Sequence, residues 1–149
     1  MTTTSRPSRP APTAPKPPVL GDGRYAVWLT GLDQRSGTVT FDVVQWLTGA
    51  AADAAFHREH PDATDRHVPN GFYIVNQNPR LRMLQVRPDV SLSVLVPMHG
   101  TEQQRISFAA FPTYLAGDLE PHDNKLWNNP FWLTVGNDRI ASAEEQYIP

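Results

Sequence analysis

Cysteine is absent from the 149 residues of this chain, and its absence excludes several kinds of chemistry. Disulfide bonds, thiolate nucleophiles, thiolate zinc sites and iron–sulfur clusters all depend on cysteine. The chain also lacks an apolar run of the roughly eighteen residues that a membrane-spanning helix needs. Residues Met1 to Ser5 do not start an apolar leader, so we expect neither a signal peptide nor a transmembrane segment in this sequence.

Two further kinds of catalytic loop are missing. Gly21-Asp-Gly23 and Gly49 match neither a phosphate-binding Walker loop nor a dinucleotide fingerprint. Ser91, Ser93 and Ser107 lack the Gly-x-Ser-x-Gly context that exposes a hydrolase nucleophile. We therefore expect no cofactor, and we assign no catalytic residue from the sequence.

Proline is concentrated near the start of the chain. Six of the fifteen prolines lie between Pro7 and Pro18, in a segment that otherwise contains Ser, Thr, Ala, Arg and Lys. Such a segment buries too little apolar surface to offset its loss of entropy on ordering. We predict a disordered, proline-rich linker over residues 1–22 and one domain over residues 23–149. The alternative is that its Pro-x-x-Pro stretches are ligands for a partner domain.

The charges divide unevenly between these two parts. The segment up to Leu20 has three cations and no acid, so ten Lys and Arg face fifteen Asp and Glu in the remainder, a formal net charge of −5. A negative domain repels nucleic-acid phosphates unless it gathers its cations on one face. We therefore expect no nucleic-acid partner, although one useful cluster of cations is present: Arg80, Arg82 and Arg87.

Short apolar runs bounded by turn residues begin at Tyr25 and are typical of strands. Asp33–Gly37 and Gly136–Asp138 are the expected turns of two hairpins. Alternation along the second run places Asp42 on the polar face, opposite Phe41. Pro88-Asp89 is expected to separate two of the strands. The predicted strands are 25–30, 38–46, 72–75, 81–86, 90–96, 131–135 and 139–148.

The sequence also predicts helix, but little of it. One helix is expected from its N-cap, Thr48, through Phe56, because Pro61 prevents its continuation. The stretch from Thr101 to Asn129 is the least regular, and only a short helix near 108–115, broken at Pro112, is expected in it. We therefore predict a mainly β domain of the α+β class. It would be a small antiparallel barrel, in one form OB-like, or a strongly curved sheet, with one or two short helices.

Four stretches resemble a domain family found in actinobacteria and Firmicutes. Many members of that family lie behind a signal peptide or lipoprotein anchor and a low-complexity linker. The resemblance therefore implies a location outside the cell or at the envelope, with a cytoplasmic location as the alternative for this chain. The matching stretches are Thr40-Phe-Asp-Val-Val-Gln-Trp-Leu-Thr-Gly49, Pro69-Asn-Gly-Phe-Tyr-Ile-Val-Asn76, Phe131-Trp-Leu-Thr-Val135 and Glu144-Glu-Gln-Tyr-Ile-Pro149.

A histidine pair on the predicted helix suggests one candidate metal site. Asp53, His57 and His60 occupy neighbouring positions of one helix face, where two imidazoles and a carboxylate could bind zinc. His67 is a possible additional ligand. The simpler interpretation is that histidines near a helix C-terminus complement its dipole, because a lone His-x-x-His pair is not specific to metalloenzymes.

Acidic and aromatic residues suggest other sites. Asp42, Glu144 and Glu145 would form a carboxylate group if the second and last strands lay close together, although acids at strand ends are usually just solvated. The tryptophans and tyrosines are more plausible as core and rim packing than as a binding platform, but such residues also dominate binding surfaces. The candidate ligand-binding residues are Asp42, Tyr73, Asn76, Trp127, Glu145 and Tyr147.

These observations favour a non-enzymatic binding or accessory domain at the bacterial envelope, with a protein or a surface polymer as its partner. One alternative is a metal-assisted hydrolase that uses Asp53, His57 and His60. A less favoured alternative is a domain that binds single-stranded nucleic acid on one face of a barrel, since such a face needs Lys and Arg between its stacking rings.

Overall fold

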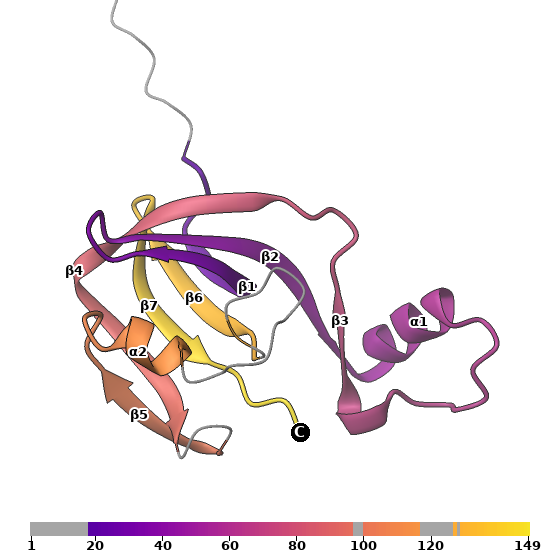
Figure 1. Ribbon diagram of the computed structural model, residues 1–149. Coiled ribbons are helices and arrows are strands. Elements are labelled where there is room, and N and C mark those ends of the chain that lie inside the picture. Colours follow the sequence, from indigo (N-terminus) through magenta and orange to yellow (C-terminus); the bar gives the residue numbers. More distant parts are fainter. Residues whose placement is uncertain (1–17, 97–99, 117–126, 128) are drawn as a thin grey trace, which may run out of the picture.

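The strands of this protein close into a small barrel, and a helical arm projects from it (Figure 1). The computed structural model describes residues 18–96, 100–116, 127 and 129–149. Within these residues the elements, in chain order, are β1 (Gly23–Asp33), β2 (Thr38–Thr48), α1 (Gly49–Glu59), the 3-10 turn η1 (Pro69–Gly71), β3 (Phe72–Val75), β4 (Leu81–Val96), β5 (Glu102–Ile106), α2 (Phe111–Leu115), β6 (Phe131–Gly136) and β7 (Arg139–Glu145).

The β1–β2 hairpin follows from its turn and its alternating side chains. Asp33 Oδ1 accepts the backbone N–H of Arg35 at 3.0 Å, and Gly37 takes the positive φ of 67° that closes the turn. Along β2, Val39 and Phe41 are buried in the core at 4% and 0% exposure. The predicted hairpin is confirmed, and its apolar face becomes one wall of the barrel.

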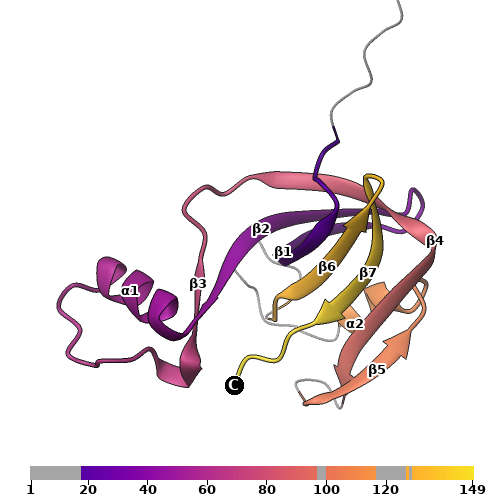
Figure 2. The same ribbon diagram turned by 180° about the vertical axis from the view of Figure 1, so that it is seen from behind.

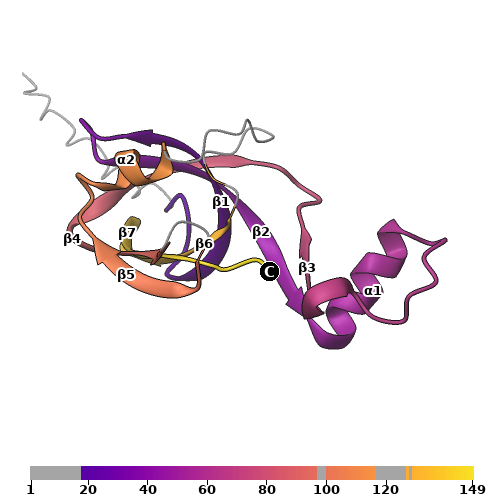
Figure 3. The ribbon, with the colours of Figure 1, turned by 60° about the horizontal axis from the view of Figure 1, so that its bottom comes forward.

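Five strands complete the barrel. β1 pairs with β2 and β6, β2 pairs with β4, and β7 pairs with β6, all antiparallel. β4 and β7 are parallel and close the circuit. Figure 3 shows these strands as a ring. The barrel has the connectivity of the OB fold, which is a five-stranded Greek-key barrel. Its third and fifth strands, β4 and β7, are parallel, and α2 precedes its fourth strand, β6. The predicted fold class is confirmed.

The prediction of two strands separated at Pro88-Asp89 is wrong, because β4 is one strand of 16 residues. Its register with β7 shifts between Val86 and Ser91, so the proline lies in an irregularity where no ladder bond requires its missing N–H. The start of β4 pairs with β2, and its end pairs with β5. The sequence signal marked a change of pairing partner and not an end of the strand.

The stretch predicted to be least regular contains a strand that the sequence did not predict. The residues of β5, Glu-Gln-Gln-Arg-Ile, have no apolar alternation, and they are extended because they pair with the apolar end of β4. The short helix near 108–115 begins at Phe111, which places Pro112 in the first turn, where a proline is tolerated. Ser107 Oγ accepts the Ala110 N–H at 3.1 Å and so supports the turn before α2.

The barrel core consists of apolar side chains from β1, β2, β4, β6 and β7, closed by α2. The rings of Phe111 in α2 and Phe131 in β6 meet edge to face at 5.6 Å between centroids. Trp127 is fully buried in the same cluster. The largest buried side chains include Trp127, Phe41, Phe111, Phe131, Leu29 and Leu133.

The arm consists of α1, η1 and β3, and it extends β2 beyond the barrel (Figure 2). Thr48 holds the N-cap position of α1 without a side-chain hydrogen bond, and Gly49 has a positive φ of 59° where the chain leaves β2. Ala52 and Ala55 are the buried positions of the helix, which ends at Glu59, before Pro61. None of the helices in the described part of the chain is long and apolar enough to span a membrane.

Part of the segment assigned to the linker contacts the domain. Asp138 Oδ1 accepts the Val19 N–H at 2.8 Å, and Asp22 Oδ1 accepts the Asn137 N–H at 2.9 Å. Leu20 packs against the barrel core. These contacts place Val19–Asp22 against the β6–β7 turn. The predicted disordered linker spans residues 1–22; residues 19–22 of it contact the domain, and residues 1–17 lie outside the described residues.

Candidate binding site

Asp42 and Asn76, which are both predicted ligand-binding residues, are in direct contact. Asn76 Nδ2 donates to Asp42 Oδ2 at 2.7 Å, and the Arg80 backbone N–H donates to Asp42 Oδ1 at 3.0 Å. Asp42 is only 7% exposed although it lies on the face opposite Phe41. Its carboxylate therefore fastens the loop between β3 and β4 to the middle of β2.

A pocket opens where β2 changes its partner along one edge. The last residue pair with β4 is Asp42 with Leu81, and the first pair with β3 is Gln45 with Val75. The two residues between them on β2 have no register partner on that edge. The pocket at this junction has a volume of about 300 Å³, and the residues that line it are Val43, Val44, Gln45, Val75, Asn76, Gln77, Asn78 and Arg82.

The lining of this pocket combines three kinds of group. Three valines supply apolar surface, and four side-chain amides supply both donors and acceptors. Arg82 is the only charged residue of the lining, and its Nη1 donates to the Arg80 carbonyl at 3.4 Å. Among the described residues, the ion pairs of arginine are Arg24 with Glu144 and Arg87 with Asp89, so the Arg82 guanidinium has no acidic partner there.

The outer face of the β2–β4 pair carries two exposed apolar side chains that lie outside the pocket lining. Met83 lies opposite Thr40 in the ladder, and Leu81 lies opposite Asp42. The exposed fractions of Leu81 and Met83 are 62% and 61%, the largest among the exposed large apolar residues of the described chain. Apolar groups beside a polar pocket are a common composition for a ligand site.

Glu145 and Trp127, also predicted to bind ligand, lie instead in a closed network. Glu145 is 1% exposed, and its carboxylate accepts four hydrogen bonds. Its Oε1 accepts Trp127 Nε1 at 2.6 Å and Asn129 Nδ2 at 2.9 Å, and its Oε2 accepts the Leu95 N–H at 2.8 Å and the Tyr114 hydroxyl at 2.6 Å. Burial, together with Glu145, raises the pKa of Tyr114 far above its usual value, so this hydroxyl remains a donor.

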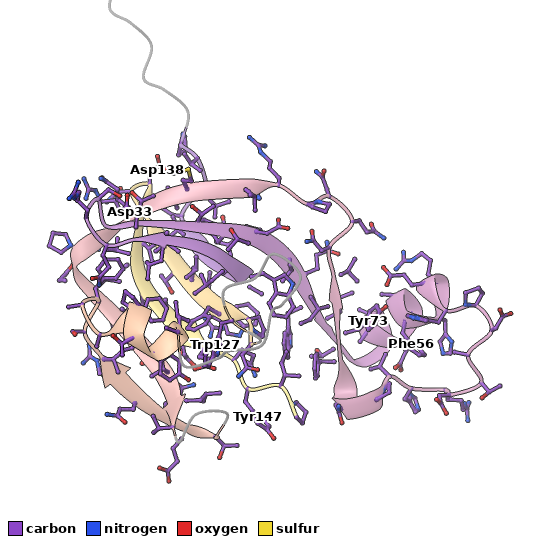
Figure 4. The ribbon with its side chains drawn as sticks, viewed as in Figure 1. Asp33, Phe56, Tyr73, Trp127, Asp138 and Tyr147 are labelled. Atoms are coloured by element: carbon purple, nitrogen blue, oxygen red, sulfur yellow. The ribbon has the colours of Figure 1, made fainter. Side chains whose placement is uncertain are left out.

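Both Trp127 and Glu145 are buried, so the exposure that would make Trp127 a contact residue is not found, and neither side chain faces a ligand from the surface. Figure 4 shows Trp127 among the strands of the barrel. The predicted carboxylate group is not formed either: Glu145 lies on the core face with its ladder partner Phe131, whereas Asp42 lies on the face opposite the core. Glu144 reaches outward to Arg24 at 3.9 Å.

The two predicted tyrosines lie in separate places (Figure 4). Tyr73 is in the arm, where its hydroxyl donates to Glu59 and its ring meets the edge of Phe56 at 5.6 Å. The hydrogen bond to Glu59 raises the pKa of Tyr73, with a smaller effect of burial. Tyr147 follows the last strand, with 39% of its surface exposed. Neither tyrosine lines the pocket.

Two of the predicted metal ligands, Asp53 and His57, contact the loop that follows α1. Asp53 Oδ2 lies 2.8 Å from His67 Nδ1, and Asp53 Oδ1 accepts the Val68 N–H at 2.8 Å. His57 Nε2 lies 3.3 Å from the Arg66 carbonyl, and His60 Nδ1 lies 3.2 Å from the Phe56 carbonyl. No three His, Asp or Glu side chains in the described ranges are placed to hold a metal ion. The residues of the candidate metal site thus make local contacts within α1 and to the loop that follows it.

Several aromatic residues form a ladder between the arm and the barrel. The rings of Phe72 and Trp46 stack at 4.4 Å, and Trp46 is tilted against Trp132 at 6.3 Å. The Arg24 guanidinium lies over Trp132 at 4.4 Å. Trp132 Nε1 donates to Gln146 Oε1 at 2.9 Å. Since these planar groups cover one another, the ladder agrees with the predicted packing role of the aromatic residues.

Of the predicted ligand-binding residues, Asn76 lines the pocket and Asp42 contacts Asn76, whereas the pocket itself was not predicted from the sequence. The missed lining residues are Gln45, Gln77, Asn78 and Arg82. Two signals pointed toward them: the Asn-Gln-Asn-Pro turn that begins at Asn76, and the arginine cluster that follows it. In comparisons with known proteins, no family model, curated protein or solved structure matches this chain.

Proposed function

We propose that this domain is a non-enzymatic binding module that holds a polymer of the bacterial envelope at the pocket between β2, β3 and β4. The observation that carries the proposal is the partner change of β2, which opens a pocket of about 300 Å³ lined by valines, amides and one guanidinium. Ligand sites typically combine an apolar surface with a few placed polar groups in this way.

The pocket is held open before any ligand arrives. Asp42 binds both Asn76 and the backbone of Arg80, so the loop that forms one wall of the pocket is anchored at two points. Preorganisation of this kind lowers the entropy cost of binding. A site that is already ordered supports a binding role.

A polymer fits this place better than a small isolated ligand. The pocket sits at the small end of the usual range for ligand sites, and β4, which carries Arg82, also carries the exposed apolar residues Leu81 and Met83 outside the lining. In barrels of this connectivity the second and third strands, here β2 and β4, form the face that binds oligonucleotides and oligosaccharides. That correspondence is an analogy, since a fold alone does not determine function.

The proposed location rests on the resemblance to a domain family, many of whose members lie behind a signal peptide or lipoprotein anchor. Fractionation of the source cells, with antibody detection of the protein, tests the location directly. Recovery in the envelope or culture medium supports it. Recovery only with cytoplasmic proteins contradicts it.

The binding proposal is tested by co-sedimentation of the purified protein with isolated cell envelopes. Gln77→Trp would fill the pocket from an exposed lining position, and Gln104→Trp places the same side chain on β5, outside the lining. We expect the wild type and Gln104→Trp to sediment with the envelopes and Gln77→Trp to remain in the supernatant. Sedimentation of Gln77→Trp at the wild-type level would show that the pocket is not the site.

A further inference from the structure

We infer that the pocket recognises a carboxylate on an acidic sugar unit of that polymer, with Arg82 as the residue that selects it. This inference rests on the proposed function and names its ligand class. Arg82 lines the pocket together with Gln45, Gln77 and Asn78, and these groups together match a ring that carries both an acid and hydroxyl groups.

The charge at this place favours an anion. The Arg82 guanidinium has five N–H donors and no acceptor, and its planar fork matches the two oxygens of a carboxylate. No acid of the described chain forms an ion pair with Arg82. The nearby acid, Asp42, already accepts hydrogen bonds from Asn76 and from the Arg80 backbone. An incoming carboxylate would therefore supply the missing partner of Arg82.

The remaining lining groups favour a sugar as the carrier of that carboxylate. Each side-chain amide offers donors and an acceptor, which is the pattern that pairs with neighbouring hydroxyl groups. Gln45, Gln77 and Asn78 are exposed and so can meet a ligand without first leaving a buried partner. Among the valines of the lining, Val44 and Val75 are only 6% and 4% exposed, so a ligand would meet mostly the amides and Arg82.

The same composition argues against nucleic acid in this pocket. Single-stranded nucleic acid is bound by aromatic rings that stack on bases and by several cations that follow the backbone. The described lining contains no aromatic residue and only one cation. A single guanidinium among amides is better matched to one carboxylate per sugar unit.

The experiment compares two ligands that differ in the charge of their carboxyl groups and in the methyl group that removes this charge. Isothermal titration calorimetry measures binding of an oligogalacturonate of four units and of the same oligomer with its carboxylates methyl-esterified. The variants are Arg82→Gln and, as a matched control, Arg87→Gln on the same strand but outside the pocket. Circular dichroism and thermal melting confirm that both variants are folded.

We expect the wild type and Arg87→Gln to bind the acidic oligomer about tenfold or more tightly than its ester, since hydrogen bonds to charged groups exceed neutral ones. Arg82→Gln should lose this preference, and Arg82→Lys should recover part of it, because a point charge replaces only part of a bidentate fork. Rising salt should weaken binding of the acid and leave the ester unchanged.

Other outcomes overturn the inference. Equal affinity of wild type for acid and ester, an unchanged preference in Arg82→Gln, or absence of binding to both oligomers would each do so. Tighter Arg82-dependent binding of a tetrapeptide with a free C-terminus, or of an oligothymidylate, would assign the pocket to a protein or to nucleic acid instead. The sedimentation of Gln77→Trp with envelopes tests the proposed function without reference to the charge of the ligand. A failure of the proposed function can therefore be told apart from a failure of the carboxylate inference.

Discussion

Two buried carboxylates organise two different regions of this molecule. Glu145 lies at the closed end of the barrel, where four donors from β4, α2 and residues 127 and 129 surround it. Asp42 lies beside the pocket, where one side chain and one backbone amide of a single loop bind it. The first carboxylate joins distant elements into a core, whereas the second fastens the loop between β3 and β4 to β2 at the edge of the pocket. The same chemical group thus serves stability in one region and the shape of a binding site in the other.

The strongest test of this comparison is Glu145→Gln. The glutamine amide must turn its NH₂ toward one of the two donor pairs, so at least one buried hydrogen bond becomes a donor–donor contact. We expect the free energy of unfolding to fall by about 2–4 kcal/mol, measured by urea denaturation.

Glu144→Gln is the matched control for Glu145→Gln, because it is the neighbouring residue with the same change of charge. Its side chain is 53% exposed and pairs with Arg24 at 3.9 Å. We expect a change within about 0.5 kcal/mol. Equal effects of the two substitutions would contradict the role of Glu145 as a buried anchor.

Asp42→Asn is expected to lose less stability than Glu145→Gln but more of its binding to envelope polymer. Asparagine cannot accept from both Asn76 Nδ2 and the Arg80 N–H, because one of its two terminal atoms is a donor. Stability should fall by about 1–2 kcal/mol, and hydrogen exchange at the Arg80 amide should accelerate. Asp89→Asn, whose side chain is 74% exposed, should change neither quantity. If the Arg80 amide stayed protected in Asp42→Asn, the Asp42 carboxylate would not be what anchors the loop that forms the pocket wall.

The role of the exposed apolar residue Met83, which lies outside the pocket lining, is tested by Met83→Ser. This side chain is 61% exposed, so its loss should leave the melting temperature unchanged. Binding to envelope polymer should weaken by about threefold to tenfold if the ligand covers Met83, as expected for the loss of about 1 kcal/mol of apolar contact. Val19→Ser, at another exposed apolar residue, is the control and should bind as the wild type. Weakened stability in Met83→Ser would show that this face is part of the core.

The smallest effect is expected at Asp53, a carboxylate on the surface of the arm. The hydrogen bond from His67, and to a smaller extent that from the Val68 N–H, lowers the pKa of Asp53 below its ordinary value of 3.8. Because the folded pKa is depressed, the contact contributes stability above the unfolded pKa and loses it as the pH falls through the folded pKa. Nuclear magnetic resonance should show the protection factor of the Val68 amide against hydrogen exchange falling as the pH drops through the lowered pKa of Asp53, while the barrel amides stay protected.

Asp53→Asn should reduce the pH dependence of the Val68 amide, and Asp62→Asn, in the exposed part of the same loop, should leave it intact. A simultaneous loss of barrel protection at that pH would show that the arm and the barrel unfold as one unit. Asp53 would then affect the stability of the barrel, as Glu145 and Asp42 do.

Local patterns predicted much of this fold from the sequence. The hairpin at Asp33–Gly37, the alternation along β2 and the arrest of α1 before Pro61 all depend on contacts a few residues apart. β5 could not be found in this way, because its polar residues become a strand only by pairing with β4. Trp127 was equally ambiguous, since an aromatic residue in an irregular stretch can be a core residue or a contact residue.

The sequence by itself determined a β-rich domain with hairpins at both ends and one helix between them, because turn chemistry and side-chain periodicity act over short distances. Only the tertiary structure decided which carboxylate is an anchor and which borders a pocket. Asp42 and Asn76 are separated by 34 residues in the chain, and Leu95 and Glu145 by 50. The register of the closed barrel sets such pairings. The pocket exists because β2 changes its partner, and no local pattern in the sequence records that change.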